Sequence, residues 1–220
     1  MNTEQIQEAV KKAAGTAKTN NDFFETNGYL VVKNLYDAKE LICDVPDKKG
    51  RYTYYKSNKD KVDFQEVEEQ VNGSTSRYFY PQYESAHSQI RLKLEKILGN
   101  KLYNTYFYDR FYFPGQELKP HVDRPACEIS VTVHVSTNLK GTKADWPIWI
   151  TTPKAKDCSV ILKPGDGMIY KGCECPHWRK KMPGNLLGIG NNKLYYHQIF
   201  FHYVLSNGSR SHFANEGNRR

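Results

Sequence analysis

The stretch YFPGQELKPHVDRPACEISVTVH, residues 112–134, decides the fold and the chemistry expected of this chain. Within it, one residue separates His121 from Asp123, and alternate side chains of a strand fall on the same face. The pair can therefore direct an imidazole and a carboxylate at one metal ion. A second stretch, residues 164–179, brings His177 after a turn-like Pro-Gly-Asp-Gly sequence. Two histidines and one carboxylate form the facial triad that leaves coordination positions open on Fe(II).

The composition indicates an ordered, strand-rich protein. Its 220 residues suit a single domain, because β-barrel domains commonly reach this size. Aromatic residues make up 13% of the chain, and sixteen of them are tyrosines, which favour strands. The five cysteines are an odd number without the spacing of a disulfide framework, which fits a reducing compartment. Residues 1–20 lack a signal-peptide-like apolar run, so we expect a cytoplasmic protein that does not enter a membrane.

The charge balance permits an acidic partner without requiring one. The chain has 32 Lys and Arg against 24 Asp and Glu, a net charge of +8. Such a charge is compatible with nucleic-acid binding. No run of Lys and Arg exceeds three residues, however, which favours an ordinary solvated basic surface. Nucleic acid is therefore the less favoured partner.

Hydrophobic periodicity predicts helices in the first half of the chain and strands in the second. Residues 4–14 and 85–98 have helical spacing, whereas residues 23–32 read as a turn that leads into a buried strand. Residues 44–76 are charged and predict a long, partly ordered excursion, and we expect the wider region 44–82 to act as a lid. The expected later strands are residues 103–113, 128–135, 147–151, 159–162, 167–170 and 195–205.

This order of elements predicts a mainly β (α+β) fold. Helices that precede a run of short strands indicate a β-sandwich or jelly roll of the cupin-like kind, with packing helices on one face. We expect one domain over residues 1–220. It would comprise a helical and lid-like part (1–100), a β core (101–205) and a tail (206–220).

Several of these features together resemble a known family. Tyr112-x-Pro-Gly, His121-x-Asp123, the strand at 129–136, the Pro-Gly-Asp-Gly turn and His177 occur in the order found in non-haem Fe(II)- and 2-oxoglutarate-dependent oxygenases. Within that superfamily the chain is most similar to the prolyl 4-hydroxylase-like branch, closely so over residues 103–204. The resemblance implies a double-stranded β-helix that holds Fe(II) in its mouth.

The resemblance also assigns roles to individual residues. It implies that His121, Asp123 and His177 bind the metal. Tyr112 matches a tyrosine that hydrogen-bonds the side carboxylate of 2-oxoglutarate, and Ser130 lies near a co-substrate-contacting position in the next strand.

The sequence departs from the family where a basic residue should pair with that side carboxylate. The family places a Lys or Arg at the start of the last strand, but residues 195–204 contain none. Gln198 and His202 share one face of this strand and can supply hydrogen bonds. The remaining sources of positive charge are Lys193, Arg124, Arg110 and Arg179.

The resemblance implies an enzyme that hydroxylates a C–H bond of a prolyl, peptidyl or amino-acid substrate and converts 2-oxoglutarate to succinate and CO2. Ascorbate is an expected accessory reductant. Two alternatives stay open, an oxygenase that modifies nucleic acid and a non-enzymatic cupin-like metal-binding module. Cys173-x-Cys175-x-His177 also suggests zinc, although no second cysteine pair accompanies it. We expect His87 on the surface, and the oligomeric state is open.

Overall fold

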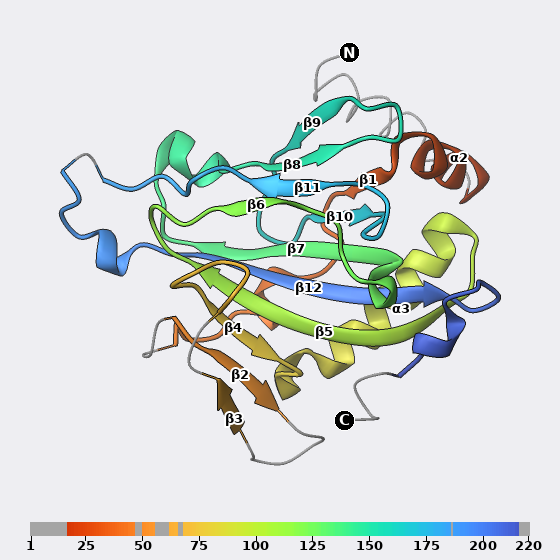
Figure 1. Ribbon diagram of the computed structural model, residues 1–220, viewed down its shortest axis with the longest axis horizontal. Helices are drawn as coiled ribbons and strands as arrows, with labels where there is room; N and C mark the ends of the chain where they lie inside the picture. Colours follow the sequence, from red (N-terminus) through yellow and green to blue (C-terminus); the bar gives the residue numbers. More distant parts are fainter. Residues whose placement is uncertain (1–16, 47–49, 56–61, 66–67, 186, 216–220) are drawn as a thin grey trace.

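The computed structural model describes residues 17–46, 50–55, 62–65, 68–185 and 187–215. Two β-sheets face each other, and the longest helix lies on the outer side of the larger sheet (Figure 1). The predicted mainly β architecture with packing helices is therefore confirmed. The helix predicted over residues 4–14 lies outside the described residues.

The larger sheet has eight strands in the order β1-β10-β7-β12-β5-β4-β2-β3. All its neighbours are antiparallel except β2 and β4, which run parallel. Long strands dominate its centre, where Tyr196 of β12 pairs with Tyr112 of β5 on one side and with Thr137 of β7 on the other. The strands are β1 (Tyr29–Val32), β2 (Tyr52–Tyr55), β3 (Val62–Gln65), β4 (Thr75–Tyr78), β5 (Leu102–Tyr112), β7 (Ile129–Thr137), β10 (Gly167–Tyr170) and β12 (Tyr196–Leu205).

The smaller sheet has four antiparallel strands in the order β6-β11-β8-β9. These are β6 (Leu118–His121), β8 (Ile148–Thr151), β9 (Asp157–Val160) and β11 (His177–Arg179). Two apolar clusters contribute to the core between the sheets, and their members include Tyr170, Ile148 and Tyr112.

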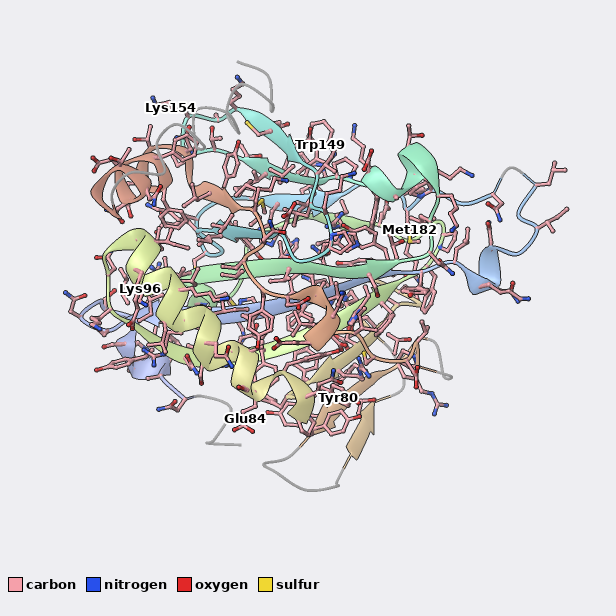
Figure 2. The ribbon with its side chains drawn as sticks, turned by 180° about the vertical axis from the view of Figure 1, so that it is seen from behind. Tyr80, Glu84, Lys96, Trp149, Lys154 and Met182 are labelled. Atoms are coloured by element: carbon pink, nitrogen blue, oxygen red, sulfur yellow. The ribbon has the colours of Figure 1, made fainter. Side chains whose placement is uncertain are left out.

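Two α-helices are described, α2 (Ala17–Asn27) and α3 (Glu84–Leu98). Helix α3 crosses the outer face of the larger sheet (Figure 2). Its apolar residues include Ile90, Leu94 and Leu98, which are buried in the cluster that also contains strand residues such as Val131 and Phe201. Gly99 ends the helix in the left-handed conformation, with φ of 72°, which costs glycine little. Short 3-10 turns occupy 38–40, 81–83, 125–127, 141–145, 191–193 and 211–213.

Most predicted elements match the structure, with three corrections among the first 100 residues. The region 44–76 contains β2, β3 and the start of β4, because its alternating tyrosines and the segment Thr75–Tyr78 extend the edge of the larger sheet. Residues 23–27 belong to helix α2 instead of a turn. His87 was expected on the surface and is only 4% exposed, since it lies on the face of α3 that packs against the sheet.

No helix within the described ranges has both the length and the apolar character needed to cross a membrane. The division into a lid-like part, a core and a tail stays a prediction, as does the cytoplasmic location.

Candidate metal and co-substrate site

The three predicted metal ligands converge between the two sheets. One ligand atom from each of His121, Asp123 and His177 lies within 4.8 Å of the other two. Each imidazole Nε2 is 3.6 Å from Oδ1 of Asp123, and the ring centroids of the two histidines are 4.4 Å apart. His177 and His121 are register partners in β11 and β6, so backbone pairing holds the two imidazoles together.

Asp123 reaches the site differently from the sequence prediction. Strand β6 ends at His121, so Asp123 does not share a strand face with it. The backbone N–H of Asp123 instead donates to the carbonyl of Gly172 at 2.8 Å. A Cβ on Gly172 would lie 2.6 Å from Oδ2 of Asp123 and 2.4 Å from the Cys127 carbonyl, so this close approach requires glycine.

Both histidines are oriented through their second ring nitrogen. Nδ1 of His121 lies 2.9 Å from the carbonyl oxygen of Lys119, and Nδ1 of His177 lies 3.1 Å from that of Cys175. A carbonyl only accepts, so each Nδ1 carries the proton and donates it. This tautomer leaves a lone pair on each Nε2, as a metal ligand requires.

Two buried side chains of the larger sheet, Ser130 and His202, form a hydrogen-bonded chain that ends at Asp123. The hydroxyl of Ser130 lies 3.2 Å from Oδ2 of Asp123 and 2.9 Å from Nδ1 of His202. Burial lowers the pKa of His202 to about 4, so this imidazole is neutral at physiological pH.

A second polar group, which we call the arginine cluster, consists of Arg179, Tyr196, His134 and Gln198. The Arg179 guanidinium carbon lies 4.9 Å from the centroid of the Tyr196 ring, which stacks on His134 at 4.1 Å. Nη1 of Arg179 donates to the Trp146 carbonyl at 2.7 Å. Among the described residues, however, its buried Nε and Nη2, the Tyr196 hydroxyl and Oε1 of Gln198 have no hydrogen-bond partner.

The arginine cluster suits a carboxylate. Arg179 is only 1% exposed and retains at least two N–H donors on the edge of its guanidinium that can bind a carboxylate bidentately. His177 and Arg179 are both buried in β11, whereas Trp178 between them is partly exposed. At about 3.3 Å per residue, their α-carbons are separated by roughly 7 Å, a span suited to a dicarboxylate that reaches from the metal to Arg179.

Arg110 is equally buried, but most of its donors are already used. Its Nε donates to Ser76, its Nη1 lies 3.4 Å from the Tyr112 hydroxyl, and its Nη2 donates to Glu68 and Gln70 at 2.9 and 2.8 Å. The two arginines therefore differ in their hydrogen bonds: Arg179 has donors without a partner, whereas the donors of Arg110 bind other side chains of the protein. The predicted residue Tyr112 is fully buried, with its ring 5.6 Å from the Arg110 guanidinium carbon and 5.2 Å from the Trp146 ring.

Other residues singled out in the sequence lie outside this arrangement. Within the described part of the chain, no metal-compatible group combines Cys173 or Cys175 with His177. Arg124 is exposed, with its guanidinium 4.3 Å from the Tyr106 ring centroid. Gln70 was not predicted from the sequence, because no local motif marks a contact made across 51 residues; its amide nitrogen lies 2.8 Å from Nε2 of His121.

The residues present fit Fe(II) and 2-oxoglutarate. Two imidazole lone pairs and one ionised carboxylate constitute the donor set of a facial triad. The unpartnered buried donors of Arg179 fit the far carboxylate of the co-substrate.

Comparisons with known proteins agree on the fold. No family model matches the sequence, and no curated protein matches it. Among solved structures, the chain is similar to a 2-oxoglutarate-Fe(II) oxygenase-family oxidoreductase from Burkholderia pseudomallei, with a TM-score of 0.59 and 11% identity. That match covers 89% of this chain and 94% of the other.

Two prolyl hydroxylase structures are also similar. The match to a prolyl-4-hydroxylase from Pseudomonas putida has a TM-score of 0.56 and 13% identity, and covers 86% of this chain and 98% of the other. The match to a prolyl hydroxylase from Trichoplax adhaerens, in complex with a hypoxia-inducible-factor peptide, has a TM-score of 0.55 and 11% identity. It covers 92% of this chain and 94% of the other. At these identities the likeness establishes the fold, the double-stranded β-helix of the 2-oxoglutarate-Fe(II) oxygenases.

Proposed function

We propose that this protein is an Fe(II)- and 2-oxoglutarate-dependent oxygenase that hydroxylates a C–H bond. The observation that carries the proposal is the convergence of His121, Asp123 and His177, with both Nδ1 atoms committed to backbone carbonyls and both Nε2 atoms left as ligands. Three protein ligands leave room on the ion for a bidentate 2-oxo acid and for dioxygen.

In this proposal Arg179 pairs with the far carboxylate of 2-oxoglutarate. Tyr196 and Gln198, which belong to the same cluster, supply further polar contacts, while the Tyr112 ring packs against Trp146 at its edge. Ser130 and His202 act indirectly, because their hydrogen bonds hold the Asp123 carboxylate in place. The positive charge thus comes from β11 instead of the last strand.

When bound, the metal and co-substrate supply the oxidising chemistry, in which 2-oxoglutarate, O2 and a C–H bond yield succinate, CO2 and an alcohol. The protein contributes positioning and exclusion of water. His177 is 3% exposed, whereas the side chains of His121 and Asp123 are 23% and 13% exposed. A substrate would therefore approach from the side of His121 and Asp123.

A prolyl, peptidyl or amino-acid substrate is the class we favour. It is supported by the likeness to two prolyl hydroxylases, one of which is bound to a peptide. An oxygenase acting on nucleic acid is the second candidate, favoured by the net charge of +8.

The test is succinate formation by the purified protein under air with Fe(II), 2-oxoglutarate and ascorbate, with and without panels of prolyl peptides, amino acids and oligonucleotides. Stimulation by peptides or amino acids supports the favoured class, and stimulation by oligonucleotides alone would replace it. A protein that binds Fe(II) but forms no succinate under any condition would be a cupin-like binding module instead.

A further inference from the structure

Residues 68–74 form a strap that contacts the proposed metal ligand His121 through one side chain. Two buried anchors hold it, the ion pair of Glu68 with Arg110 and the side chain of Val71, which belongs to the apolar cluster around Tyr112. Gln70 lies between these anchors and is exposed to solvent, and its amide nitrogen contacts Nε2 of His121. The strap therefore holds one side chain between solvent and the site.

The orientation of the Gln70 amide follows from its two partners. Oε1 accepts from Nη2 of Arg110 at 2.8 Å, so it cannot be exchanged with the nitrogen without placing two donors face to face. Nε2 of Gln70 lies 2.8 Å from Nε2 of His121, which is unprotonated because Nδ1 donates to the Lys119 carbonyl. The amide therefore donates to the lone pair that would bind the metal.

We propose that Gln70 is a positioning residue that caps the metal-binding nitrogen of His121 and competes with the metal for it. A lone pair cannot accept a hydrogen bond and coordinate an ion at once, so loading the site requires the amide to leave. Arg110 still donates to Oε1 of Gln70 after the amide has moved. The released N–H donors of Gln70 would therefore stay beside the metal, on the side from which substrate approaches. The inference rests on the proposed metal triad.

The first test measures metal affinity, independently of turnover. Co(II) is titrated into the metal-free full chain and followed by its visible absorption, in the wild type, in Gln70→Ala and in Asn72→Ala. Asn72 provides a matched control because it is an exposed amide of the same strap. Loss of one competing hydrogen bond predicts that Gln70→Ala binds Co(II) about 2- to 10-fold more tightly, while Asn72→Ala matches the wild type.

Equal or weaker affinity of Gln70→Ala would overturn the proposal, since a merely structural residue would not strengthen metal binding when removed. If the wild type itself binds no Co(II), the metal triad of the proposed function is lost as well, so the two failures are distinguishable.

A second measurement follows the amide directly. The side-chain N–H signals of Gln70, assigned by their disappearance in Gln70→Ala, should shift when Zn(II) saturates the wild type. Signals that do not move on saturation would contradict the displacement.

Discussion

Replacing Arg179 by Met tests the assignment of the co-substrate pocket. Met keeps much of the apolar volume between Trp146 and Tyr196 but removes the charge and all guanidinium donors. Deleting one partner of a buried ion pair costs about 3–5 kcal/mol. We therefore expect the Kd of 2-oxoglutarate to rise by roughly two to four orders of magnitude.

The assay is calorimetric titration of the Co(II)-loaded protein with 2-oxoglutarate and with 2-oxovalerate, which has the same chain length but lacks the far carboxylate. Arg179→Met should lose most of the preference for 2-oxoglutarate while it binds 2-oxovalerate much as before. Lys180→Met removes the same charge from the next, exposed residue and should leave both affinities unchanged. An affinity for 2-oxoglutarate within threefold of the wild type, or an equal loss for both acids, would refute the role of Arg179.

Two further predictions concern the pH dependence of stability and the close packing of Gly172 against Asp123. Burial lowers the pKa of His87 to about 3, so the folded state excludes a proton that the unfolded chain binds below pH 6.5. Stability attributable to His87 is therefore complete above pH 6.5 and is lost as pH falls toward 3, at up to about 1.4 kcal/mol per pH unit. In urea unfolding of the metal-free protein, His87→Gln should decrease this slope, and an unchanged slope would contradict the assignment. Gly172→Ala forces its new methyl group against Asp123 and Cys127, so we expect weaker Co(II) binding and a loss of about 1–3 kcal/mol of stability. Wild-type affinity and melting temperature in that variant would show that the close approach is unimportant.

The sequence predicted the parts of the fold that have long, strongly patterned segments. Helix 85–98 and the strands around 103–113 and 195–205 were found because apolar residues recur at the appropriate period over ten or more residues. His121 was expected on a strand, but no bounds were predicted for β6 and β11, because these strands are only four and three residues long and consist largely of polar residues. Both strands carry predicted metal ligands, so the periodic pattern is weakest at the candidate site.

The candidate site was predictable to a similar extent. The motif indicated the triad, but only tertiary packing separates Arg179, with unpartnered donors, from Arg110, whose donors are largely used. The contact of Gln70 with His121 depends on a strap whose course no local pattern encodes. His87 was predictable after all, because it lies three and seven residues before Ile90 and Leu94 and so shares their helical face.

The most direct test of the proposed function is the rate of succinate formation from 2-oxoglutarate with Fe(II) under air, in the wild type and in Asp123→Ala. The proposal predicts turnover by the wild type and a decrease of at least about 100-fold in the variant, because loss of a ligand should exceed the 10- to 100-fold effect of losing an outer-shell partner. Circular dichroism and melting temperature should show that the variant remains folded. Comparable turnover by a folded Asp123→Ala protein, or no turnover by a metal-loaded wild type, would contradict the proposal.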